Sequence, residues 1–125
     1  MIKSKVKVIR SDKVESIQPL ETGCHERWIF DKNTPTENSA MAMAIIEPGK
    51  RSGMHKHSVE ECYYIIRGRG NAIIGEKKIE LEPDLCMYAP AETPHNFINM
   101  STCESLIILV FFSKNDFKTS FVEDE

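Results

Sequence analysis

The sequence has no long apolar run, no excess of basic residues and no secretory signal. None of its apolar stretches approaches the roughly 20 residues that a membrane-spanning helix needs, so we expect a protein that does not cross a membrane. The formal net charge of −3 argues against sequence-independent nucleic-acid binding, which relies on a basic face. The basic start of the chain has no apolar core of the signal-peptide type, which predicts a cytoplasmic protein.

The cysteines are also sparse, and none is closely spaced with another. The sequence has four of them and no C-x-x-C pair, so neither a disulfide framework nor a closed cysteine-rich zinc site is expected. Cys62, Cys86 and Cys103 lie in apolar or strand-like runs, and we expect them to be small buried side chains. Cys24 lies beside His25 in a polar stretch, and the sequence assigns no role to it.

Helical periodicity is missing as well, whereas short β-rich segments are frequent. Such segments, divided by turn residues at close and regular spacing, predict an antiparallel sandwich or barrel. The length of 125 residues fits one domain with a sizeable core. The expected strands are KVKVI (5–9), 27–30, 41–47, 55–57, 62–67, a hairpin over 71–83 that turns near Gly75, 85–90, 95–100 and 105–112.

Three segments have a further predicted role. In KVKVI, lysine alternates with apolar residues, which is typical of an edge strand. The very apolar run SLIILVFF (105–112) indicates either a surface covered by another subunit or a central core strand. The acidic end FVEDE (121–125) is expected to be a frayed tail.

Three of the four histidines lie in two separated segments. His55 and His57 are two residues apart, Glu61 follows four residues later, and His95 lies in PAETPHNFIN. Side chains alternate along a strand, so His55 and His57 share a face and are aimed alike. Three imidazoles and one carboxylate bind a divalent first-row metal and leave positions open for water or substrate.

These residues resemble the two motifs of the cupin family. The first motif, over 49–68, is matched at every fixed position, and the second, over 84–99, is kept except where Asp84 and Glu92 replace glycine. The matching residues are Gly49, His55, His57, Glu61 and Gly68, then Pro90, His95 and Asn99. The chain resembles the small single-domain cupins, which implies an all-β fold, an antiparallel double-stranded β-helix (jelly-roll) barrel, over residues 1–125.

The resemblance implies a ligand set and an assembly. The metal ligands would be His55, His57, Glu61 and His95, holding one divalent transition metal per chain. We favour manganese or iron, and zinc, nickel and copper remain open. The resemblance also implies a homodimer joined by sheet packing, with the N-terminal region 1–20 at its interface.

Strand alternation places further residues at the pocket. Arg51, in step with His55, could bind a substrate carboxylate or phosphate, or could be a solvated loop arginine. Tyr63, in step with Glu61, could donate a proton and contact substrate, or be a core aromatic. Phe97, in step with His95, is a candidate substrate contact. We take Glu61 and Tyr63 as the candidate catalytic residues.

His25 and Arg27 share a face if their strand is regular. They could form a second polar wall of the pocket, although surface placement is the alternative that their polarity favours.

The leading functional hypothesis is a metal-dependent enzyme that acts on a small polar or oxygenated metabolite, with the metal binding a substrate oxygen. The resemblance implies dioxygenase, isomerase or epimerase, decarboxylase or lyase chemistry. The first alternative is a non-catalytic module that binds a metal or small ligand. The second is a vestigial site in a barrel that serves assembly.

Overall fold

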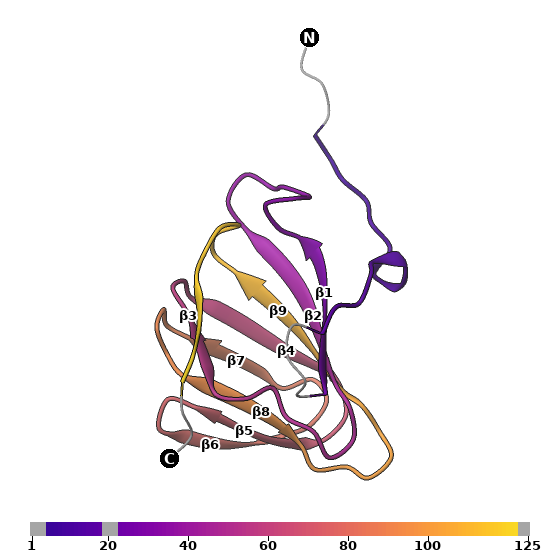
Figure 1. The fold of residues 1–125 in the computed structure, drawn as a ribbon, viewed down its shortest axis with the longest axis vertical. Coiled ribbons are helices and arrows are strands. Elements are labelled where there is room, and N and C mark those ends of the chain that lie inside the picture. Colours follow the sequence, from indigo (N-terminus) through magenta and orange to yellow (C-terminus); the bar gives the residue numbers. More distant parts are fainter. Residues whose placement is uncertain (1–4, 19–22, 123–125) are drawn as a thin grey trace.

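A computed structural model describes residues 5–18 and 23–122, which form two antiparallel sheets with five strands each in that part of the chain. The sheets have the orders β1-β2-β9-β4-β7 and β10-β3-β8-β5-β6, and they face one another as a jelly-roll barrel (Figure 1). Within the described residues, no helix is long and apolar enough to cross a membrane. The strands are β1 (Cys24–Phe30), β2 (Ala40–Ile46), β3 (His55–His57), β4 (Glu61–Arg67), β5 (Gly70–Ile74), β6 (Lys77–Leu81), β7 (Cys86–Ala89), β8 (His95–Asn99), β9 (Leu106–Phe112) and β10 (Thr119–Phe121).

The all-β prediction is confirmed, and the apolar run SLIILVFF is the central strand of its sheet. Leu106, Ile108, Val110 and Phe112 of β9 point into the core, and the residues between them point outward. Strand β9 is flanked by β2 and β4 on its two sides. A strand in this position explains the apolar run without a partner subunit, which favours the second of the two interpretations made from the sequence.

Strand β2 has small residues on its inner face. The sequence AMAMAII places Ala40, Ala42 and Ala44 on the face that points into the barrel, and Met41 and Met43 on the opposite face. Alanine side chains fill little of the space between two sheets. The inner face of β2 therefore leaves room for a cavity next to β1.

Both ends of the chain depart from the prediction. Residues 5–10 form no strand and run away from the barrel (Figure 1), with the Val8 side chain 90% exposed. A β-prone segment becomes a strand only where a neighbouring strand takes up its backbone hydrogen bonds. Conversely, Phe121 belongs to β10, which pairs with β3, so the predicted frayed tail is wrong at this residue. Residues 123–125 lie outside the described part of the chain.

The prediction of buried cysteines is wrong for Cys62, Cys86 and Cys103, which are all exposed. On β4, Glu61 and Tyr63 take the inward positions, so Cys62 between them points outward. Cys86 points outward on the neighbouring strand β7, where it lies opposite Tyr64 of β4. Tyr64 is two residues after Cys62 and is therefore on the same face of β4. An apolar neighbourhood in the sequence does not indicate which face of a strand a residue occupies.

The two positions where the family usually has glycine keep the backbone conformation of a glycine. Asp84 has φ 74° and Glu92 has φ 65°, in the left-handed region that side chains with a Cβ occupy at a cost. The turn geometry of the second motif is therefore preserved at both positions, although the residues differ.

Glu92 allows a direct measurement of this backbone cost. We expect Glu92→Gly to be more stable than Glu92→Ala by about 1 kcal/mol, since relief of the left-handed strain exceeds the extra entropy of glycine in the unfolded chain. Both variants lose the ion pair from Lys56 Nζ to Glu92 Oε2 at 3.2 Å, so the ion pair cancels in the comparison. Urea unfolding of the two variants measures the difference. An alanine variant as stable as the glycine variant would show that position 92 carries no strain.

Candidate metal centre

The two sheet strands β3 and β8 bring three histidines to one point on the inner face of the barrel. His55 lies directly opposite His95 in the β3–β8 register, and His57 is on the same face of β3. One ring nitrogen from each of the three lies within 4.8 Å of the other two. Two distant stretches of sequence thus supply one cluster of nitrogen ligands, as metal binding requires.

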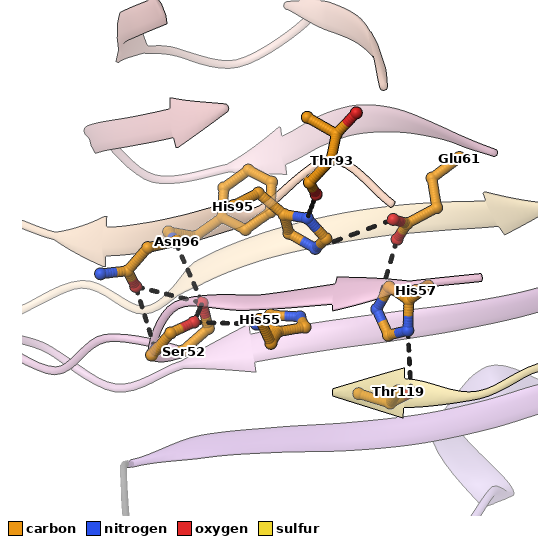
Figure 2. Close-up of polar contacts among 10 residues, drawn as sticks. Ser52, His55, His57, Glu61, Thr93, His95, Asn96 and Thr119 are labelled. Atoms are coloured by element: carbon orange, nitrogen blue, oxygen red, sulfur yellow. Dashed lines mark hydrogen bonds and ion pairs between the residues drawn. The ribbon is translucent and has the colours of Figure 1, made fainter. Parts of the chain in front are cut away.

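Backbone carbonyls fix the orientation of two of the imidazoles. The Nδ1–H of His55 donates to the carbonyl oxygen of Gly53 at 2.8 Å, and that of His95 donates to the carbonyl oxygen of Thr93 at 2.9 Å (Figure 2). A carbonyl only accepts, so the proton of each ring lies on Nδ1. The lone pair of each Nε2 is then free to bind a metal, an arrangement typical of histidine ligands.

His57 is oriented by the C-terminal strand. Its Nδ1 lies 2.8 Å from the Oγ1 of Thr119 on β10 (Figure 2), and the Phe117 ring lies edge-on against it with a centroid distance of 5.4 Å. A second aromatic ring, Phe121, lies 5.5 Å from the ring of His55. No local pattern in the sequence indicates that this segment returns to β3, so none of these three C-terminal residues was predicted to reach the histidines.

We expect Thr119→Val to weaken metal binding by about 10- to 100-fold, because it removes the hydrogen bond that orients His57. Thr119→Ser keeps a hydroxyl and should restore most of the affinity. Ser120→Ala, on the same strand but pointing away, is the matched control. Competition against a chromophoric chelator measures the affinity of all three variants. Equal affinities for the valine and serine variants would show that the hydroxyl does not position His57.

Glu61 of β4 lies beside two of the three histidines. Its Oε1 lies 3.5 Å from the Nε2 of His57, and its Oε2 lies 3.8 Å from the Nε2 of His95. The side chain is 2% exposed, and Oε1 has no hydrogen-bond partner among the described residues. Burial raises the pKa of the carboxyl to about 8. A buried carboxylate is costly without a positive charge beside it, so this residue fits a bound cation.

Burial also keeps the imidazoles in the form that binds metals. It lowers the pKa of His57 to about 3 and that of His95 to about 4, with the neighbouring imidazoles adding to the effect, and it lowers the pKa of His55. Neutral imidazole nitrogens and a hard carboxylate oxygen suit a divalent first-row ion. The donor set therefore fits such an ion, with His55, His57, His95 and Glu61 as its candidate ligands.

The cluster lies at the wall of a cavity of about 240 Å³ inside the barrel. Tyr63 and Phe97, both predicted to face the pocket, line it, and their rings are 5.1 Å apart. The Tyr63 hydroxyl is buried and interacts with the carboxyl group of Glu61, two residues before it on the same face of β4. Burial and then the charge of Glu61 raise the pKa of this hydroxyl, so it stays protonated and can donate a hydrogen bond.

The structure does not bring Arg51 to the cavity. Its side chain is exposed and does not line the cavity, and its backbone bridges to that of Ile98. Alternation from His55 predicts the face of a residue only within one strand, and Arg51 precedes β3 by several loop residues. This placement corresponds to the alternative of a solvated loop arginine.

Strand β1 supplies a further wall of the cavity. The residues that line the cavity lie on the face of β1 opposite to the one that carries His25 and Arg27. Cys24, Glu26 and Trp28 line the cavity. His25 and Arg27 instead point outward, where His25 pairs with Glu47 and Arg27 donates to a backbone carbonyl. Trp28 is the sole tryptophan of the chain. A large aromatic residue in a short strand usually lies on the buried face, so Trp28 could have indicated from the sequence which face of β1 points inward.

Comparison with known proteins reveals a family and distant relatives. A family model described as a cupin domain matches residues 42–112. An uncharacterized protein of Methanocaldococcus jannaschii is 37% identical over 62 residues, which are 49% of this chain and 50% of that protein. Auxin-binding protein 4 of Zea mays is 26% identical over 86 residues, 62% of this chain and 42% of that protein. The chain thus spans half or less of the length of these relatives.

A solved structure matches over nearly the whole chain. The polyketide cyclase RemF from Streptomyces resistomycificus superposes with a TM-score of 0.75, covering 95% of this chain and 88% of that one at 17% identity. At this identity the similarity establishes the fold. The family match ends at residue 112, so strand β10, with its contacts to His55 and His57, lies beyond it.

Proposed function

Because this chain belongs to the cupin family, and its barrel gathers three oriented imidazoles around a buried carboxylate, we propose that it is a metal-dependent enzyme acting on a small oxygenated metabolite. The observation that carries the proposal is that the three histidine side chains are oriented and uncharged, as metal ligands need to be, and that a buried carboxyl group lies beside them. The histidines are tethered through Nδ1 and kept neutral by burial, and Glu61 lacks a partner for one oxygen. They lie at the wall of a cavity large enough for a small molecule.

The proposed ligands are His55, His57, His95 and Glu61, for one divalent transition ion per chain. We favour manganese or iron, since an open site of nitrogen and oxygen donors without cysteine suits both. When bound, such an ion supplies Lewis acidity to a substrate oxygen and lowers the pKa of bound water.

Two side chains of the cavity are proposed to act on the substrate. The protonated Tyr63 hydroxyl donates a hydrogen bond to a substrate oxygen, because the Tyr63 side chain lines the cavity and its ring lies beside that of His95 at a centroid distance of 5.6 Å. Phe97 and the other apolar walls exclude water from the reacting end, which strengthens each polar contact made there. Reaction classes that fit are dioxygenase, isomerase or epimerase, decarboxylase and lyase.

Elemental analysis of protein purified without an affinity tag or chelator is the first test. We expect about one manganese or iron ion per chain, and turnover of at least one compound in a screen of hydroxy acids, keto acids, sugars and phenols. Metal-free protein that takes up no ion on reconstitution would refute the metal centre. A full metal content without turnover would move the conclusion to the binding alternative.

A binding module is the second candidate function. The observation in its favour is the similarity to a maize protein named as auxin-binding. In this case the site would hold a ligand in the same cavity without converting it. Recovery of an unchanged ligand after prolonged incubation with metal-loaded protein would distinguish binding from catalysis.

A homodimer in the cytoplasm is proposed as the working state. The extended N-terminal segment exposes Val8, and the outer face of the β9-β4-β7 region exposes Phe111 and Tyr88. Apolar side chains of this kind are common at subunit interfaces. Sedimentation at low micromolar concentration checks the assembly, and a sole species of 14.3 kDa would contradict it.

A further inference from the structure

The cavity has a second carboxyl group, on β1, which belongs to the other sheet than the histidine strands β3 and β8. Glu26 of β1 lines the cavity together with its neighbours Cys24 and Trp28. It is half-buried, and burial raises its pKa. Its charge in turn contributes to raising the pKa of the Cys24 thiol, after burial itself. Glu26 therefore lies close to Cys24 on the cavity wall and is partly removed from water.

Within residues 5–18 and 23–122, no side chain pairs with the carboxyl group of Glu26. Among the described residues, its carboxyl group has no hydrogen-bond or ion-pair partner, and its backbone alone is paired, with Ile17. No lysine or arginine is found among the described residues that line the cavity. A half-buried carboxyl without a counter-charge is unfavourable. A ligand that brings a positive charge would remove this cost.

The space beside Glu26 is shaped for a ligand. Glu26 lies opposite Ala44 in the β1–β2 register, and Trp28 lies opposite Ala42. Both alanines also line the cavity. Their small side chains leave room along β1, where the indole of Trp28, stacked on the ring of Phe112 at a centroid distance of 5.3 Å, supplies an apolar wall.

We propose that Glu26 selects a substrate or ligand that carries a positively charged nitrogen on an apolar body. This inference builds on the proposed function, because it names the chemistry of the part of the substrate or ligand that lies along β1. The charged nitrogen pairs with the Glu26 carboxylate, and the apolar body fills the space left by Ala42 and Ala44. Anionic compounds are disfavoured in this part of the cavity, where the charged side chain is negative.

Trp28 fluorescence provides the test, because the sole tryptophan lines the cavity two residues from Glu26. The probes are 2-phenylethylamine and 2-phenylethanol, which have the same shape and differ in charge at neutral pH. We expect the amine to bind at least about 10-fold more tightly than the alcohol, and Glu26→Gln to reduce that ratio to within about twofold of unity. Glu80→Gln removes the same charge from an exposed position on β6 and should keep the wild-type ratio.

Two results would overturn the proposal. The first is equal binding of the two probes to the wild-type protein, which includes no binding of either at millimolar concentration. The second is an unchanged ratio of amine to alcohol affinity in Glu26→Gln. The wild-type ratio decides the matter even if that variant fails to fold. Ala44→Leu is a second variant that keeps the carboxyl but fills the space beside it. It should weaken both probes.

Metal analysis of the same samples separates this inference from the proposed function. Each titration is run on protein as purified and after chelator treatment. An amine preference that depends on Glu26 in protein that binds no metal would refute the metal centre and leave the role of Glu26 standing. A full metal content without a preference for the amine would support the metal centre and refute the role of Glu26.

Discussion

Replacing His57 with alanine should reduce the metal content of the purified protein to below about a tenth of an ion per chain and abolish any turnover. His57 is buried, and its Nε2 lies 3.5 Å from a Glu61 oxygen. Its loss removes one of the nitrogen donors for the proposed ion, whose positive charge would balance the buried Glu61 carboxylate. Inductively coupled plasma mass spectrometry measures the metal, and near-ultraviolet circular dichroism checks that the variant is folded.

His25→Ala is the matched control for this experiment. His25 is the one histidine outside the cluster, and its Nε2 pairs with Glu47 on the outer surface at 2.7 Å. We expect this variant to retain the full metal content. A folded His57→Ala protein with wild-type metal content would show that His57 is not a ligand. Equal loss in both variants would indicate a nonspecific effect of removing a histidine.

Strand alternation predicts part of the arrangement of the histidine cluster, because that part of its geometry is local. His55 and His57 share a face by strand alternation alone, and Tyr63 follows Glu61 on one face of β4 for the same reason. One long-range fact was still required, the pairing of β3 with β8 that places His95 opposite His55. The proximity of His95 to His55 was expected because the spacing of the two motifs resembles that of a known family. The chemistry of the individual residues did not indicate it.

The parts that sequence reasoning missed depend on contacts between segments far apart in the chain. Thr119 reaches His57 only because β10 pairs with β3 across 62 positions. Glu26 enters the cavity only because Trp28 fixes the inward face of β1, and an error of one residue exchanges the two faces of a strand. Local propensity alone also fails for KVKVI, which lies outside regular structure here.

Gly70→Ala should destabilise the barrel through steric overlap alone, because Gly70 is the one glycine of the described residues without a positive φ. A Cβ at Gly70 would lie 2.1 Å from the carbonyl oxygen of Ile98 and 3.3 Å from the Cα of Asn99. These atoms belong to the backbone of β8 and cannot rotate away. We expect a loss of about 3 kcal/mol or more, seen as a fall in Tm of about 10 °C or more.

Gly49→Ala distinguishes steric overlap from backbone strain. A Cβ at Gly49 would meet no atom within 4 Å, but its φ is 73°, so we expect a loss of only about 1 to 2 kcal/mol. Gly70→Ala has a second consequence, because β8 also carries His95. Displacement of this strand should weaken metal binding together with stability, whereas Gly49→Ala should leave the affinity close to that of the wild type. Similar losses of stability in the two variants would mean that β8 moves aside at little cost, and unchanged metal affinity in Gly70→Ala would show that such a shift does not reach His95.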